Sequence, residues 1–261
     1  MAAFEKLSLV MPRPSPKMER IYAALEEGWP EAKINSHEFD RYVLWGLIGN
    51  NILYTQGKYI FCDMPYKGRY DPNNEDWNNT YWRWCYDGLH DNRKLDVPSD
   101  RFENWDISIK PWQIEGDYIL LCPSSETMTF FMHGPKNVDE WIRSTSDEIR
   151  KYTNRPIKFR EKKPLRERTK LFDELLFNDD YYCVVSLNSN AATEAIWAGI
   201  PAITLGQHIS NPVTKNSLSD INDLYYGDIT EWLCMLSYSQ YTKEELMDGT
   251  AARLVRKYMN D

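Results

Sequence analysis

Between residues 117 and 206 the sequence alternates short apolar runs with helix-like stretches, and this alternation constrains the fold more than any other feature of the chain. The apolar runs, each short enough for a buried strand, are DYILLC, PIKF, YYCVV and IPAITL. Helical periodicity fills the gaps between them. Strands that alternate with helices form parallel sheets, because each helix carries the chain back across one face of the sheet. The segment therefore predicts an α/β half-sheet of the nucleotide-binding type.

The first part of the chain shows a similar alternation, with the strand-like runs KLSLVM, RYVLWGL and KYIFCD and the amphipathic stretch KMERIYAALEEGW. Because 261 residues exceed what one typical core requires, we expect two domains, residues 1–116 and 117–261. Residues 64–92 are rich in Asn, Asp, Tyr and Trp without a sustained period, and we expect a long loop held by aromatic side chains. Thr242 and Glu245 have capping-box spacing, which predicts the start of a C-terminal helix over 242–259.

The formal net charge of −8 disfavours broad, sequence-independent binding to nucleic acid or to anionic membranes. Residues 150–170 nevertheless contain ten Lys or Arg residues and only two acids, so a local anion site is compatible with the acidic chain. The five cysteines are odd in number and widely spaced, without CxxC or HExxH patterns, so we expect reduced core thiols, no structural zinc and a cytoplasmic location. No run approaches the ~20 apolar residues of a membrane span.

The stretch SLNSNAATEAIWAGIPAITLG, residues 186–206, sets small polar residues between an apolar strand and an apolar helix. At the carboxyl end of a parallel strand the next helix points free N–H groups outward, and an anion could approach them past Asn188, Ser189 and Asn190. Thr193 adds a hydroxyl, and the Glu194 carboxylate could accept two hydrogen bonds from a vicinal diol such as a ribose. Two interpretations stay open, a nucleotide site and a capped helix start whose acid favours the positive helix end.

The segment TEAIWAGIPAITLG resembles the signature of GT-B glycosyltransferases and their epimerase relatives, in which a helix with Glu-Ala precedes Gly-x-Pro and a strand. The runs ILLCPSS and RPIKFREKKP are similar to elements of capsule and Kdo-type transferases, so the resemblance covers about residues 117–210. It implies two facing Rossmann-like domains with the C-terminal helix crossing back onto the first. It also implies a nucleoside diphosphate sugar as co-substrate without a further cofactor or metal, with Glu194 on the ribose and Ser189, Asn190 and Thr193 facing the diphosphate.

Other residues of the second half are predicted at the same crevice. Arg160 and Lys162 follow a strand whose tip opens on it, and their charges could hold a diphosphate leaving group. Ser124, in the turn after DYILLC, and His208, after IPAITLG, are further candidates for donor binding. A solvated basic face, a serine-rich turn and a structural histidine are the alternative interpretations.

In the first half, Asp63 ends the run KYIFCD and is the preferred candidate for the base that takes the acceptor proton, with His90 as the second candidate. Aromatic faces suit sugar rings and extruded bases, so we expect acceptor contacts in the stretch that follows. These expected contacts are Tyr66, Arg69, Trp82 and Arg83. The alternatives are a turn aspartate, a structural histidine and aromatic packing within the domain.

The sequence therefore predicts a metal-independent glycosyltransferase that moves a sugar from a nucleoside diphosphate sugar to an acceptor hydroxyl. The acceptor would be a glycan or a hydroxymethylated base in phage DNA. An epimerase or hydrolase of nucleotide sugars, a non-catalytic nucleic-acid-binding module built on the basic stretch, and a degenerate transferase acting as a scaffold are the alternatives. The donor's sugar and base, the stereochemical outcome and the oligomeric state stay open.

Overall fold

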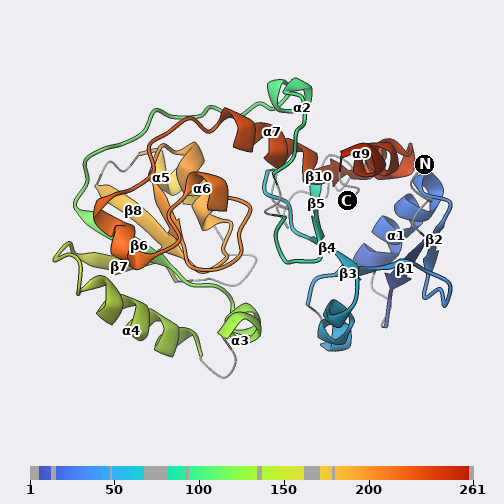
Figure 1. Ribbon diagram of the computed structural model, residues 1–261, viewed down its shortest axis with the longest axis horizontal. Coiled ribbons are helices and arrows are strands. Elements are labelled where there is room, and N and C mark those ends of the chain that lie inside the picture. The colour runs from blue at the N-terminus through green and yellow to red at the C-terminus, as the bar shows by residue number, and fades with distance from the viewer. Residues whose placement is uncertain are drawn as a thin grey trace. The chain divides into compact units, whose positions relative to one another are not determined.

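The chain divides into two compact units in the computed structural model (Figure 1). The first unit combines residues 1–104 with residues 233–261, and the second unit is residues 105–232. The structure describes residues 6–12, 16–47, 49–67, 81–91, 94–133, 137–161, 171–177 and 180–258. The expected boundary after residue 116 differs from this division, because the chain joins the second unit at Trp105 and returns to the first at Leu233.

A six-stranded sheet with the order β10-β5-β4-β3-β1-β2 forms the centre of the first unit. Its strands are β1 (Leu7–Val10), β2 (Ala32–Ile34), β3 (Arg41–Trp45), β4 (Tyr59–Asp63), β5 (Tyr81–Tyr86) and β10 (Gln240–Thr242). The first four strands pair in parallel, whereas β5 pairs antiparallel with β4 and with β10. The expectation of one continuous loop over 64–92 is wrong for Tyr81–Tyr86. This aromatic run lacks a polar face because it is almost entirely buried between two neighbouring strands.

The helices of the first unit are α1 (Pro16–Gly28), the 3₁₀ helix η1 (Gly49–Gln56), α2 (Asp100–Glu103), α8 (Lys243–Met247) and α9 (Thr250–Tyr258). Thr242 and Glu245 form the predicted capping box, and it starts α8. The C-terminal residues return to the first unit, where α8 and α9 pack against α1. The Arg101 guanidinium fixes this return, because it donates to the carbonyls of Ser237 and Gln240 and pairs with Glu245.

The second unit is built on a four-stranded parallel sheet with the order β7-β6-β8-β9. Its strands are β6 (Tyr118–Cys122), β7 (Ile157–Phe159), β8 (Tyr181–Ser186) and β9 (Ala202–Thr204). The helices are α3 (Glu126–His133), α4 (Val138–Ile149), α5 (Leu171–Leu175), α6 (Ala191–Trp197), η3 (Asn211–Val213) and η4 (Leu218–Asn222), while α7 (Thr230–Tyr238) crosses the boundary between the units. The predicted α/β class with parallel sheets is confirmed, whereas the facing arrangement of two domains stays a prediction.

Alternation along each strand divides the second unit's core into two layers. Leu121 and Val185 face α4 and pack against Trp141, whereas Leu120 and Val184 face α5 and α6. Figure 1 shows α4 on one side of this sheet and α5 and α6 on the other. We call these two sides the α4 face and the α6 face.

All five cysteines are buried and none forms a disulfide, as the sequence predicts. Within the described part of the chain, no helix combines the length and the apolar character that crossing a bilayer requires.

Candidate functional site

Predicted residues follow each strand of the second unit at the edge where the strands end, which we call the carboxyl edge. Ser124 follows β6, Arg160 follows β7, Asn188 follows β8 and His208 follows β9. Because the four strands are parallel neighbours, their ends meet at one edge of the sheet. Residues that are far apart in the sequence therefore lie at one edge of the second unit.

The turns after β6 and β8 are joined by a buried hydrogen bond. The Ser124 hydroxyl donates to the Asn188 side-chain oxygen over 2.5 Å. Beyond Asn188, the Ser189 hydroxyl accepts from the N–H of Ala191 at 3.3 Å, while Asn190 forms no side-chain cap on α6. The helix-cap interpretation therefore applies to Ser189.

Thr193 and Glu194 are successive residues of α6 whose side chains contact different segments. The Thr193 hydroxyl is fully buried and hydrogen-bonds to the Ser210 hydroxyl at 3.2 Å, which ties α6 to the segment after β9. Glu194 is 7% exposed, and its carboxylate accepts a 3.0 Å hydrogen bond from the Phe172 N–H of α5. The carboxylate thus lies between α6 and α5, close below the surface.

Arg160 leaves β7 toward the α6 face and forms a two-point ion pair with Glu174 of α5. The Nε to Oε2 distance is 2.9 Å, and the second nitrogen lies 2.8 Å from Oε1. The hydrogen bonds that Arg160 donates to Glu174 raise the pKa of Arg160 despite its partial burial. Lys162, its predicted partner in diphosphate binding, lies outside the described residues.

Charged groups converge around the end of β6 on this face. Burial raises the pKa of the Cys122 thiol to about 12, and the charges that act on it come from Arg160, Glu194 and Glu174. Glu194 also raises the pKa of Arg160, as a smaller contribution than that of Glu174. The two carboxylates and the guanidinium therefore form one cluster at the carboxyl edge.

Ser186 is a buried residue of this edge that the sequence analysis did not single out. It is the last residue of β8, pairs in register with Cys122 of β6 and shares the α6 face with Val184. Among the described residues its hydroxyl has no hydrogen-bond partner. A buried hydroxyl without a partner loses its hydration without compensation, so it marks a place where a polar ligand group would be favourable. The available signal was a small polar residue at the end of an apolar strand.

A cleft of about 630 Å³ opens on the other side of the same edge, between α3, α4 and the end of β7. Its lining combines apolar side chains, hydroxyls and acids. Ser124 and Ser125 belong to the turn after β6, and Ile142 and Phe159 supply apolar surface. Phe159 is 66% exposed, although it is a large aromatic residue.

His208 is fully buried, and its Nδ1 accepts a 3.1 Å hydrogen bond from the Ser210 N–H. Ser210 in turn contacts Thr193 and accepts from the Thr214 hydroxyl at its carbonyl oxygen. These bonds hold the segment after β9 against α6. The described contacts of His208 are therefore with the protein.

Four of the candidates of the first unit lie in or beside one buried network. The Asp63 carboxylate, 30% exposed, accepts from Arg83 at 3.2 Å and from the Met64 N–H at 2.7 Å. The His90 ring lies between Arg83, 3.5 Å from Nε2, and the Tyr66 hydroxyl, 3.1 Å from Nδ1. Arg83 also lies over the Tyr66 ring.

The remaining acceptor candidates are placed differently. Trp82 is buried in the core against Trp45, with ring centroids 4.9 Å apart, so packing accounts for its aromatic side chain. Arg69 lies outside the described residues. The structure thus brings Asp63, Arg83, His90 and Tyr66 together and leaves Trp82 on the core side of β5.

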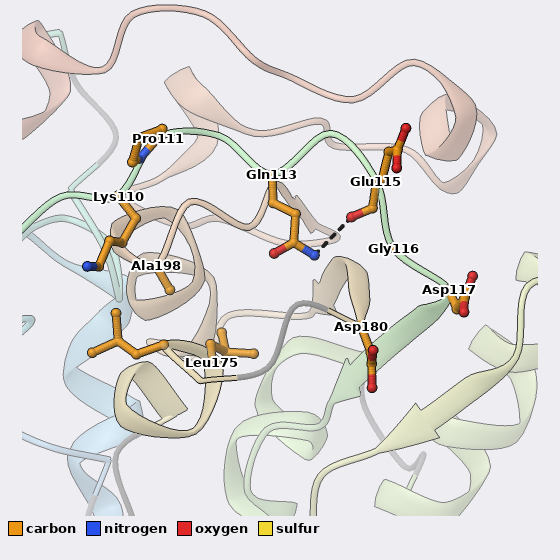
Figure 2. Close-up of a pocket in the computed structure, with 10 residues that line it drawn as sticks. Lys110, Pro111, Gln113, Glu115, Gly116, Asp117, Leu175, Asp180 and Ala198 are labelled. Atoms are coloured by element: carbon orange, nitrogen blue, oxygen red, sulfur yellow. Dashed lines mark hydrogen bonds between the residues drawn. The ribbon is translucent and has the colours of Figure 1, made fainter.

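A second cleft of the second unit lies at the opposite, amino edge of the sheet (Figure 2). Lys110, Glu115, Asp117 and Asp180 line it, and its volume is about 640 Å³. Gln113 crosses it, donating to the carbonyls of Glu115 and Tyr181 at 2.9 Å each. None of the predicted site residues lines this cleft, so it is distinct from the carboxyl edge.

No protein-family model matches the chain, and no curated protein matches it. Among solved structures the chain is similar to Thermosulfurimonas dismutans KpsC, a beta Kdo 2,7 transferase, with 11% sequence identity and a TM-score of 0.47. The match covers 95% of this chain and 99% of that one.

Proposed function

We propose that the protein is a glycosyltransferase that binds a nucleoside diphosphate sugar at the carboxyl edge of the second unit. The observation that carries the proposal is the grouping of Glu194, Arg160 and the Ser186 hydroxyl, which has no partner among the described residues, at the ends of neighbouring parallel strands. This edge is where open α/β sheets bind nucleotides. The sequence resemblance around Glu194 supports the same assignment.

Glu194 is the proposed ligand of the ribose. A carboxylate has about four acceptor positions, and with two of them it can accept from both hydroxyls of a vicinal diol. The side chain is only 7% exposed, so the ribose has to approach where the five-residue helix α5 covers it. A displacement of α5 by the incoming ribose is therefore part of the proposal.

Arg160 is the proposed ligand of the diphosphate. A guanidinium presents five N–H donors in a planar fork that suits phosphate oxygens, and Glu174 orients this fork through two of its nitrogens. As the glycosidic bond breaks, negative charge develops on the leaving diphosphate, and a fixed cation stabilises it. We propose that this cation serves in place of a metal ion.

Asp63 is the proposed base for the acceptor hydroxyl. Its carboxylate is oriented by two hydrogen bonds and remains partly exposed. His90 is fully buried, and both its ring nitrogens lie near protein groups, which makes it the weaker candidate.

The basic stretch gives less support to a nucleic-acid-binding module. Arg155 stacks on Tyr182 at 3.8 Å, Lys158 lies 3.3 Å from the centre of the Tyr118 ring, and Lys151 pairs with Glu148. These three described cations are thus engaged with the protein itself. A surface that tracks phosphates needs cations available to release counterions.

A thermal-shift panel of UDP, GDP, CDP, CMP and dTDP sugars tests the proposal. A ligand that binds only the folded protein raises its melting temperature, and we expect one nucleotide series to do so. That donor should then be consumed when acceptor hydroxyls are supplied. If no nucleotide shifts the transition, the proposal is overturned.

A further inference from the structure

Two successive residues at the end of β7 separate the carboxyl edge into two halves with different chemistry. Side chains alternate along a strand, so Phe159 and Arg160 leave β7 on opposite faces. Arg160 pairs with Glu174 of α5 on the α6 face, whereas Phe159 lines the 630 Å³ cleft with Ile142 of α4. The charged cluster is therefore on one side of the edge and the cleft on the other.

We propose that this cleft binds a sugar ring, and that the ring it selects is uncharged or carries an amino group. The inference rests on the proposed function in one respect, that the nucleotide occupies the α6 face. It adds the chemical class of the sugar and the place where the ring lies. The proposed contacts to the nucleotide determine neither the class of the sugar nor the position of its ring.

The walls of the cleft match the two sides of a sugar ring. Val138, Ile142 and Phe159 provide apolar surface, and Phe159 is 66% exposed with no aromatic partner among the described residues. Ser124, Ser125 and Thr127 are the hydroxyl-bearing residues of the lining. A ring with C–H groups on its face and hydroxyls at its rim can satisfy both surfaces. The cleft volume lies within the range of about 300–1,000 Å³ that small-molecule sites occupy.

The charges of the described lining residues disfavour anionic rings. Glu126, Asp139 and Glu161 line the cleft, no described Lys or Arg does, and within the described chain none of the three acids has an ion-pair partner. The amino end of α3 adds a partial positive charge of about one half, which is small against three carboxylates. Carboxylates accept hydrogen bonds from ring hydroxyls and attract an ammonium group, and they repel a carboxylate or phosphate substituent.

The hydrogen bond between Ser124 and Asn188 lies between the two halves. Ser124 lines the cleft, and Asn188 leads into α6, which carries Glu194. A donor that extends from Glu194 to the cleft would cross the edge at this pair. The geometry thus orients the donor with its ribose on the α6 face and its sugar ring on the α4 face.

Titration of the full chain with methyl glycosides, followed by saturation-transfer NMR and calorimetry, tests the inference. The probes are the methyl glycosides of glucose, galactose, glucosamine and glucuronic acid. We expect at least one of the neutral or amino rings to bind and the uronate to bind at least about tenfold more weakly. Phe159→Ala should weaken binding by about three- to tenfold, and Glu161→Gln should reduce the preference for the amino ring over its neutral counterpart.

Phe177→Ala is the matched control, because Phe177 is a 90% exposed phenylalanine of the same unit outside the cleft, and its loss should leave binding unchanged. Binding of the uronate as tight as that of the other rings, or equal binding by wild type and Phe159→Ala, would overturn the inference. Failure of all rings to bind would overturn it too. Stabilisation by nucleotide, measured on the same variants, reports separately on the proposed function.

Discussion

At the carboxyl edge, the direction of a side chain decides whether the residue serves packing or is a candidate for binding. Thr193 and Glu194 are neighbours in α6, yet the threonine bonds to Ser210 whereas the glutamate reaches the backbone of α5. Residue type alone placed both in the donor site. Side-chain direction, which depends on where α6 lies against its neighbours, separates a structural hydroxyl from a candidate ligand.

Replacement of Ser186 by alanine tests whether its buried hydroxyl serves a ligand. Because the hydroxyl has no partner among the described residues, Ser186→Ala should change the free energy of unfolding by less than about 1 kcal/mol. Nucleotide affinity should fall by roughly three- to tenfold, which is the loss of one hydrogen bond. Urea denaturation and calorimetric titration measure the two effects. A large loss of stability together with unchanged affinity would assign the hydroxyl to the fold.

The sequence predicted which candidate residues share an edge of the sheet better than it predicted their contacts. Ser124, Arg160, Asn188 and Glu194 could be placed at one edge because parallel strands end together. The ion pair of Arg160 with Glu174 could not be foreseen, because it depends on where α5 packs against the end of β7. The exposure of the Phe159 ring could not be foreseen either, because it depends on how α4 packs beside β7.

At the level of elements, close backbone approach fixes how α1 meets the C-terminal helix α8. Gly28 ends α1, and a Cβ at this position would lie 1.8 Å from the Leu246 carbonyl oxygen and 2.8 Å from the Gly249 nitrogen. Only a residue without a side chain allows this contact. Glycine at this position therefore serves two purposes: it ends the helix, and it allows the backbone that includes Leu246 and Gly249 to approach closely.

Gly28→Ala tests this contact. Alanine is favoured over glycine in a helix by about 1 kcal/mol, but the backbone atoms of α8 have to move, so we expect a net loss of about 2 kcal/mol or more. Gly57→Ala is the control, because the nearest heavy atom to its added Cβ would be 3.9 Å away. Urea denaturation of both variants is the measurement. Equal stabilities would show that α1 and α8 are not held at this distance.

Strands with an apolar pattern were predictable, whereas strands defined by their partners were not. The apolar runs of β1, β3, β4, β6 and β8 can be recognised in the sequence. The strand β10 has three residues and no pattern of its own, and it forms because β5 offers an edge to Gln240–Thr242. Local sequence carries no information about such a partner.

The molecule as a whole contains one continuous unit and one discontinuous unit. Residues 105–232 form the second unit alone, whereas the first unit needs residues 233–261 to supply β10, α8 and α9. The contacts of Arg101 with Ser237, Gln240 and Glu245 join the two parts of the first unit. A division at one point of the chain could not describe this arrangement, since contacts between distant segments define it.

The stability of the protein at alkaline pH depends on both layers of the second unit's core, because each layer contains a buried thiol. Burial raises the pKa of the Cys122 and Cys183 thiols from 9.0 to about 12 each. The unfolded chain releases these protons above pH 9.0, while the folded chain retains them, so their stabilising contribution is complete below pH 9.0 and is lost as pH rises toward about 12. Each thiol should add a slope of about 1.4 kcal/mol per pH unit to this loss. Urea denaturation at a series of pH values in this range measures the free energy of unfolding. This free energy should fall less steeply with pH for Cys183→Ala than for wild type, and identical slopes would contradict the account.

The most direct test of the central claim, that Glu194 holds the ribose of a nucleotide, is a calorimetric titration of three proteins. The ligand is the nucleotide that stabilises the wild type in the thermal-shift panel, and the proteins are wild type, Glu194→Gln and Glu148→Gln. Glu148 is a partly exposed acid near the end of α4, and α4 ends at the amino edge of the sheet. Its replacement therefore removes a charge from the same unit, away from the proposed site. We predict that Glu194→Gln stays folded and binds at least about tenfold more weakly than wild type, while Glu148→Gln binds as wild type does. Equal binding by Glu194→Gln and wild type would contradict the claim.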